Sequence, residues 1–177
     1  MEKAGLSEST RSRLANQLDC LQLILGGRDA AAINRRPASG KWSAHENLAH
    51  LARMHEITLE RIRRILSEGR PQLLRYKAED DPEWPQWTAM RTEEVVGRLS
   101  TLRDDLIQLV TRLSPEQLSR VGVHGALGGM TIPECIEFFL LQGCYAARSR
   151  RIDRRRLTPR TGACPAPATQ RGEGCDR

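Results

Sequence analysis

The sequence is poor in aromatic residues and has no long apolar run. Phe, Trp and Tyr make up 4% of the 177 residues, a composition more typical of packed helices than of β-sheets. No segment approaches the roughly 18 consecutive apolar residues that a membrane span needs, and the N-terminus lacks the apolar segment of a signal peptide. We therefore expect a cytoplasmic, all-α protein with no membrane partner.

Local motifs for redox, zinc-ribbon and phosphate chemistry are also missing. The five cysteines include no Cys-x-x-Cys pair, which argues against a zinc ribbon or a disulfide framework. Cys20 and Cys135 are expected to be small core residues. The chain has no phosphate-binding glycine loop and no nucleophile with a paired base. Any chemistry must therefore come from residues that the fold brings together.

The positive charge is confined to one end of the chain. Residues 143–177 contain nine arginines and three acidic residues, which accounts for the whole net charge of +6. Such arginines can contact phosphates, but no aromatic platform or recognition helix accompanies them. We therefore expect a solvated charge run and no nucleic-acid partner.

Apolar residues recur at three- and four-residue steps in several segments, which is the spacing of amphipathic helices. The predicted helices cover residues 7–25, 43–68, 92–113 and 131–152. The helix that begins at Ser43 carries two apolar lines, which implies two packing partners. The sequence thus predicts an up-and-down four-helix bundle.

The connections differ in length and composition. Residues 68–87 show no periodicity and are predicted to form a long crossover loop between the second and third helices. Residues 121–130 are predicted to be a Gly-rich loop, preceded by a short capped turn at Ser114.

One domain over residues 1–152 is expected, followed by a tail over residues 153–177. The tail is rich in Arg, Pro and Gly. It has too little apolar surface to offset the roughly 1 to 2 kcal/mol per residue that backbone ordering costs. The sequence therefore predicts a disordered tail.

Two segments carry a family resemblance. Residues 37–43 read Pro-Ala-Ser-Gly-Lys-Trp-Ser and lead into Glu-Asn-Leu-Ala-His-Leu at residues 46–51, and the loop at residues 123–128 leads into Thr131 and Glu134. Over about residues 14–141 the chain resembles the DinB-like metalloenzyme superfamily. The resemblance implies a bundle that often forms a homodimer and often holds a divalent metal with three histidines. Some such proteins are S-transferases that use a small-molecule thiol, and others are hydrolases.

The implied metal ligands are incomplete in this chain. Carried over residue by residue, they fall on His50, Gln142 and Ala146, so one imidazole of three remains. Three neutral imidazoles would hold Zn²⁺ or Ni²⁺ and leave a position for water or a thiol, whereas His50 alone binds far more weakly. Glu46 and His124 are candidate substitute ligands.

The remaining histidines and Glu46 have simpler interpretations. Glu46 lies three residues after Ser43, which is the spacing of a capping box. His55 lies on the leucine stripe of its helix and is expected to be a hydrogen-bonded core residue. His45 lies in the first helical turn and is expected to be solvated.

Two functional interpretations remain open. In the first, the chain is a DinB-like protein with a degenerate active site that serves as a non-catalytic binding or dimerisation module. In the alternative, it is an active metal-dependent S-transferase or hydrolase, with Zn or Ni held by His50 and substitute ligands.

The ligands, the apolar periodicity and the charge balance all change together near Gln142. One hypothesis is a shifted reading frame or altered gene end, because out-of-frame GC-rich sequence is rich in Arg, Pro, Gly and Ala. Another reading frame of the DNA from codon 142 should then encode a helix with the sequence His-x-x-x-His. Translation of the other two frames tests this, and the absence of such a helix from both would rule the hypothesis out.

Overall fold

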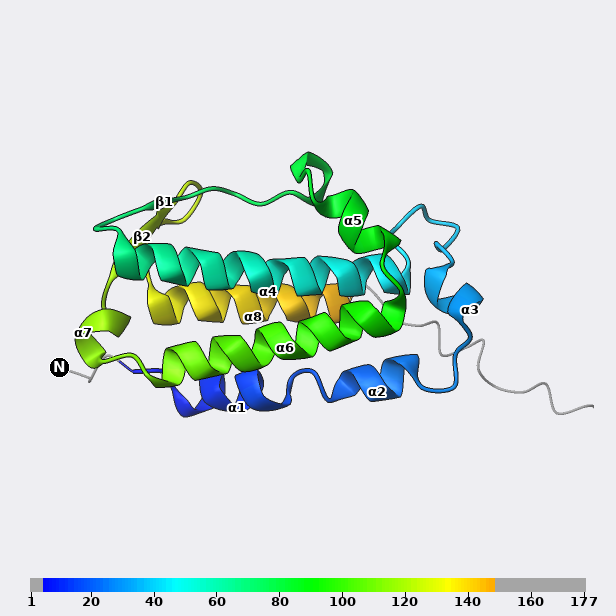
Figure 1. The fold of residues 1–177 in the computed structure, drawn as a ribbon, viewed down its shortest axis with the longest axis horizontal. Helices are drawn as coiled ribbons and strands as arrows, with labels where there is room; N and C mark the ends of the chain where they lie inside the picture. The colour runs from blue at the N-terminus through cyan, green and yellow to red at the C-terminus, as the bar shows by residue number, and fades with distance from the viewer. Residues whose placement is uncertain (1–4, 149–177) are drawn as a thin grey trace, which may run out of the picture.

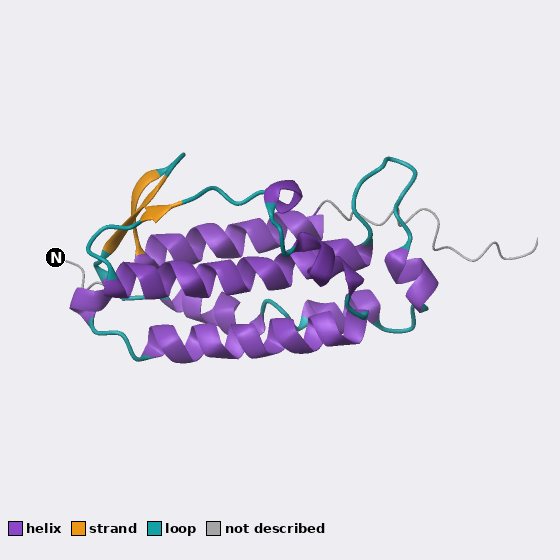
Figure 2. Ribbon diagram, turned by 45° about the horizontal axis from the view of Figure 1, so that its top comes forward, coloured by secondary structure: helices purple, strands orange, loops and turns teal. Residues whose placement is uncertain are grey.

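The computed structural model describes residues 5–148, with side chains up to residue 141. Within this part of the chain the main helices pack side by side as a bundle (Figure 1), and a small sheet covers one end (Figure 2). The bundle consists of α1 (Glu8–Asn16) followed by α2 (Cys20–Leu25), then α4 (Ala44–Ser67), α6 (Thr92–Thr111) and α8 (Ile132–Arg148). The helical bundle predicted from the sequence is confirmed, with a sheet that was not predicted.

The first predicted helix is interrupted, so the expectation of one continuous helix was wrong. Helix α1 ends before Gln17 and α2 begins at Cys20. The carbonyl oxygen of Leu14, which a continuous helix would pair with the amide of residue 18, accepts a 2.8 Å hydrogen bond from Arg103 Nη1 instead. Helix α2 has no fully buried residue, and Cys20 is exposed rather than in the core. A short helix, α3 (Ala30–Asn34), follows.

Helix α4 begins with the predicted capping box. The amide of Glu46 donates to Ser43 Oγ at 3.1 Å, and the amide of Ser43 donates to Glu46 Oε2 at 2.7 Å. The helix then packs against both α6 and α8, the two packing partners that its two apolar lines predicted. Its buried positions include Leu48, Leu59 and Ile62.

Helices α4 and α6 run in the same direction, so the bundle does not alternate strictly up and down (Figure 1). At one end His45, near the start of α4, bonds Thr92 at the start of α6 at 3.0 Å. At the other end Arg120, which follows α6, donates to the carbonyl oxygen of Leu66 in the last turn of α4. The crossover between them must therefore return the chain along the length of the bundle.

The crossover contains regular structure where the sequence predicted a loop. It includes β1 (Gln72–Leu73), the 3₁₀ turn η1 (Ala78–Asp80) and α5 (Trp84–Ala89). Trp87 in α5 is 2% exposed and packs with Leu48 and Leu99 in a cluster between α4 and α6. The buried indole of Trp87 helps to fix this segment, which has no periodic pattern that the sequence could reveal.

The predicted Gly-rich loop is a β-hairpin. After the capped turn α7 (Pro115–Leu118), β2 (Val121–His124) pairs antiparallel with β3 (Gly128–Thr131) and parallel with β1. Gly122 allows β2 to lie close to α4 and to the side chain of Leu73 in β1, because a Cβ there would lie 3.0 Å from Ile65 Cδ1 and 2.7 Å from Leu73 Cδ1. Gly128 closes the turn at a φ of 74°, which glycine adopts without strain. Short strands with several glycines resemble a loop in sequence.

Helix α8 begins at the predicted Thr131 cap, where the amide of Thr131 donates to Glu134 Oε2 at 2.7 Å. Ile132, Ile136 and Leu140 are fully buried, and Cys135 is buried as expected. Neither the tail nor the boundary at residue 152 falls within the described residues. Among residues 5–148 no helix combines the length and the apolar character that crossing a bilayer would require.

Arg103 lies in the middle of the bundle, on the helix for which the sequence predicted a buried face of Leu, Val and Ile. It is 3% exposed, and no carboxylate pairs with it in the described residues. Its guanidinium donates to Leu14 O, to His55 Nε2 at 2.9 Å and to Gln17 Oε1 at 3.3 Å. One side chain thus connects α1, α4 and α6.

Replacing Arg103 with Met should lower the free energy of unfolding by about 2 to 4 kcal/mol, because several buried acceptors lose their donor. Chemical denaturation followed by circular dichroism measures this. Arg112→Met, at an exposed position that ends α6, is the matched control and should change stability by less than about 0.5 kcal/mol. Equal effects of the two substitutions would contradict this role for Arg103.

Candidate functional site

His50, the histidine carried over from the family pattern, lies among aromatic rings in the first half of α4. Its ring centroid is 5.1 Å from that of Trp42, 5.5 Å from that of Tyr76 and 6.3 Å from that of Trp84. The indoles of Trp42 and Trp84 also lie 5.1 Å apart. We call these four residues the His50 cluster. Its members come from α4, from the loop before it and from the crossover, which explains why the sequence pattern did not group them.

Two polar atoms in the His50 cluster are buried without a hydrogen-bond partner. They are Nδ1 of His50 and the hydroxyl of Tyr76, which Asp81 approaches without meeting hydrogen-bond geometry. Unsatisfied buried polar atoms are rare in folded proteins and mark places where a water molecule, an ion or a ligand can bind. The His50 cluster is therefore a candidate site.

Burial also sets the protonation of the cluster. It lowers the pKa of His50, an effect that the charge of Glu79 partly opposes. Burial raises the pKa of Tyr76, and the charge of Asp81 raises it further. Near neutral pH, His50 is therefore an uncharged imidazole and Tyr76 a neutral phenol. Both can exchange hydrogen bonds with a ligand.

Arg53 fixes the crossover beside this cluster. Its guanidinium contacts Asp81 at 2.8 Å, Glu56 at 2.7 Å and Glu83 at 3.0 Å. Asp81 is 5% exposed, so this ion pair is largely shielded from water and holds the crossover on α4. Sequence reasoning did not identify Arg53, Tyr76 or Glu79.

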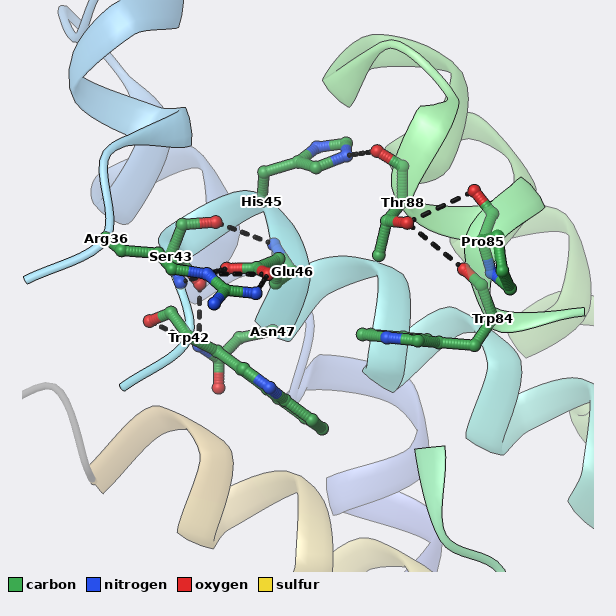
Figure 3. A network of polar contacts seen from close by, with 9 residues as sticks. All are labelled: Arg36, Trp42, Ser43, His45, Glu46, Asn47, Trp84, Pro85 and Thr88. Carbon is green, nitrogen blue, oxygen red and sulfur yellow. Dashed lines mark hydrogen bonds and ion pairs between the residues drawn. The ribbon is translucent and has the colours of Figure 1, made fainter. Parts of the chain in front are cut away.

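Glu46 is occupied by its structural role. Besides closing the capping box, its carboxylate accepts hydrogen bonds from both Nε and Nη2 of Arg36 (Figure 3). The bond from Arg36 is the main cause that lowers the pKa of Glu46 to about 2. The capping interpretation is confirmed, and Glu46 is not free to act as a substitute ligand.

His45 is buried, so the expectation that it is solvated was wrong. It is 4% exposed and bridges two helices: Nε2 lies 3.0 Å from the carbonyl oxygen of Thr88, and Nδ1 lies 3.0 Å from Thr92 Oγ1. Figure 3 shows its side chain directed at Thr88. Because a carbonyl only accepts, Nε2 carries the proton and Nδ1 accepts from the Thr92 hydroxyl. Both nitrogens of His45 are thus in use.

His55 is the hydrogen-bonded core histidine that the leucine stripe predicted. It is fully buried, Nδ1 donates to the carbonyl oxygen of Leu51 at 2.7 Å, and Nε2 accepts from Arg103. Its ring meets that of Phe139 edge to face at 4.5 Å. Burial and the charge of Arg103 lower the pKa of His55 to about 3.

His124 lies in a different place from His50. It is buried at the end of β2, its ring lies 5.7 Å from that of Phe138, and its Nδ1 accepts from the amide of Ala126 at 3.3 Å. It lines a pocket together with Cys135 and Arg61, none of which belongs to the His50 cluster. The structure therefore does not bring His124 to His50 as a substitute ligand.

The described side chains around His50 do not by themselves form a metal centre. Within residues 5–141 the structure contains no group of three or more His, Cys, Asp or Glu side chains that could hold an ion. The other two family positions, Gln142 and Ala146, lie in α8, and their side chains fall outside the described residues. Neither residue type has an imidazole. The described neighbours of His50 are thus aromatic rings rather than the two further imidazoles of a three-histidine centre.

Comparison with known proteins identifies the family. The chain matches the DinB superfamily over residues 8–141 and therefore belongs to it. A similar solved structure is YfiT from Bacillus subtilis, described as a probable metal-dependent hydrolase with an unusual four-helix bundle topology. It is 15% identical, with a TM-score of 0.67 over 80% of this chain and 84% of that one, which establishes a common fold. No curated protein matches this sequence.

The buried, neutral His55 should make stability depend on pH. In the unfolded chain the imidazole takes up a proton near pH 6.5, whereas the folded protein resists protonation until about pH 3. Stability should therefore fall as the pH drops below 6.5, by about 2 kcal/mol between pH 7 and pH 5 from this residue. His55→Gln should lose correspondingly less over that range. Urea unfolding at both pH values measures it, and identical losses in both proteins would disprove the assignment.

Proposed function

We propose that this DinB superfamily member is a non-catalytic bundle that binds a small organic ligand without a resident metal. The observation that carries this proposal is that neither the substitute ligands considered from the sequence nor the other two described histidines are available to His50. Glu46, His45 and His55 are each held by hydrogen bonds that the fold requires, and His124 lies in a separate pocket. A lone imidazole cannot hold Zn²⁺ or Ni²⁺ tightly.

One feature supports ligand binding rather than a purely structural bundle. It is the pair of buried polar atoms on His50 and Tyr76 that have no hydrogen-bond partner. By analogy with its family, the chain is expected to form a homodimer. A stable dimer in metal-free buffer supports the proposal, and a metal-free monomer in light scattering counts against the dimer.

A metal-dependent hydrolase or S-transferase is the second candidate, favoured by one observation. Nδ1 of His50 is an unpaired, uncharged nitrogen, and the charge of Glu79 acts on it. A divalent ion could use His50 and Glu79 if a further donor came from the second half of α8. YfiT, which shares the fold, is described as a probable metal-dependent hydrolase. This candidate requires stoichiometric metal.

Metal analysis of the purified full-length chain separates the two candidates. After incubation with zinc or nickel and dialysis, we expect less than about 0.1 ion per chain, with no further decrease in His50→Ala, because one imidazole binds too weakly to survive dialysis. A content near one ion per chain that disappears in His50→Ala would establish the metalloenzyme instead.

A gain-of-binding variant provides the positive control. Gln142→His combined with Ala146→His should complete the family triad and raise the zinc content towards one ion per chain. Adding His50→Ala to that variant should abolish the gain. If the double variant binds no zinc, then the carry-over of the ligand positions to residues 142 and 146 is wrong.

A further inference from the structure

A second site lies beyond the His50 cluster, near the end of the bundle that the sheet covers. A small pocket lies between α4, the sheet and α8, and its cavity volume is about 10 Å³. This is room for about one water molecule, so the pocket is too small for an organic ligand. Only a water molecule or a single ion fits inside it.

Three sulfur-bearing side chains line this pocket, and each comes from a different element. They are Met54 of α4, Met130 of β3 and Cys135 of α8. None of the three is more than 8% exposed, and Cys135 forms no disulfide. Thioether sulfur is a weak hydrogen-bond acceptor and offers little to a water molecule. Thioether and thiolate sulfur are soft ligands, which select soft ions such as Cu(I).

Two further groups in the pocket suit a thiolate. His124 is 6% exposed, and its Nδ1 accepts from the amide of Ala126, so the proton of the neutral ring is on Nε2. Within the described residues this Nε2 has no hydrogen-bond partner. Arg61 also lines the pocket. An N–H donor and a positive charge both stabilise a thiolate, so His124 acts as a donor to sulfur and not as a ligand.

The charge of the pocket decides which ion it accepts. Across the described residues no carboxylate forms an ion pair with Arg61, so an added positive charge would be costly here. Burial raises the pKa of the Cys135 thiol to about 11, so the thiol is protonated before an ion binds. When Cu(I) binds, the S–H bond breaks, a Cu–S bond forms and the proton leaves to solvent. One positive charge thus replaces another, and copper is neither oxidised nor reduced.

Zn²⁺ suits this pocket less well for two reasons. After the same exchange it would leave one extra positive charge beside Arg61. Its usual protein ligands are thiolate, imidazole and carboxylate groups, whereas two of the three sulfur atoms here are thioethers. The pocket therefore favours a monovalent soft ion over a divalent one.

We propose that this pocket binds one Cu(I) ion through the thiolate of Cys135 and the thioether sulfur atoms of Met54 and Met130. The inference goes beyond the proposed function, which concerns His50 and divalent ions, because no member of the His50 cluster lines this pocket. The three ligands come from segments far apart in the sequence, which explains why no local motif marks the site.

Methionine methyl groups report the position of the ion by NMR. Met54 and Met130 line the pocket, whereas Met90, at the end of α5, does not, and its sulfur accepts from Arg98 at 3.6 Å. The full-length chain is titrated without oxygen with up to five equivalents of Cu(I), one for each cysteine, so that the other four cysteines do not deprive the pocket of copper. We expect saturable shifts of the Met54 and Met130 signals and none of Met90. The same titration with Zn²⁺ should move none of the three.

Two pairs of variants test the ligands, compared by the concentration of a competing Cu(I) chelator that reverses the Met54 shift. Cys135→Ser should weaken Cu(I) binding at least about 100-fold, whereas Cys20→Ser, the same change at an exposed cysteine, should leave it unchanged. Met130→Leu should weaken binding at least about tenfold, and Met90→Leu should not. Because Leu and Met have similar volumes, Met130→Leu is expected to fold even if Cys135→Ser does not.

The inference is overturned if five equivalents of Cu(I) leave the Met54 and Met130 signals in place, or if Met90 shifts as strongly as they do. It is also overturned if Zn²⁺ moves these signals as Cu(I) does, or if either ligand variant behaves like its control. None of these outcomes bears on His50, because the zinc and nickel content of the chain is measured separately.

Discussion

The guanidinium of Arg103 is the contact on which the bundle depends most. A buried charge is costly unless it is fully hydrogen-bonded, and here the acceptors are neutral. Two of them, the carbonyl oxygens of Arg13 and Leu14, lie at the C-terminal end of α1, where the helix dipole is negative. The favourable end of one helix therefore replaces the carboxylate that would otherwise pair with this arginine.

This arrangement links the break after α1 to the protonation of His55. Arg103 donates to the carbonyl oxygen of Leu14, which would accept the next backbone hydrogen bond if α1 continued. It also donates to Nε2 of His55, which must then be unprotonated. The ring of Phe139 on α8 contacts His55 edge to face, and the guanidinium of Arg103 lies 5.8 Å from its centroid. All four helical segments thus meet around one cation, and a histidine at this point cannot serve as a metal ligand.

The predictability of the structure follows from how local each signal is. The capping boxes at Ser43, Ser114 and Thr131 and the leucine periodicity of α6 involve residues within one or two helical turns, and the structure confirms them. The crossover was not predictable, because β1 pairs with a strand about 50 residues away and α5 is held by the buried ring of Trp87 and by the hydrogen bond between His45 and the Thr88 carbonyl oxygen. Arg103 was also missed, since its acceptors lie about 50 and 90 residues earlier.

In the candidate site, too, local signals were predictable and long-range contacts were not. His50 could be found from the family pattern and His55 from its position on a leucine stripe. The burial of His45 depends on Thr88 and Thr92, which only the crossover brings near. The crossover likewise brings Tyr76 and Trp84 beside His50. The packing of β2 near α4 brings His124 and Arg61 to the same pocket. Spacing along one helix identifies candidate residues, but the contacts across the fold decide what they do.

The most direct test of this account is anomalous X-ray scattering, at the zinc and nickel absorption edges, from crystals of the full-length chain grown with each metal. The account predicts no ordered ion within coordination distance, about 2.0 to 2.2 Å, of a nitrogen of His50. An anomalous peak at that distance, completed by two or more further protein ligands, would contradict it.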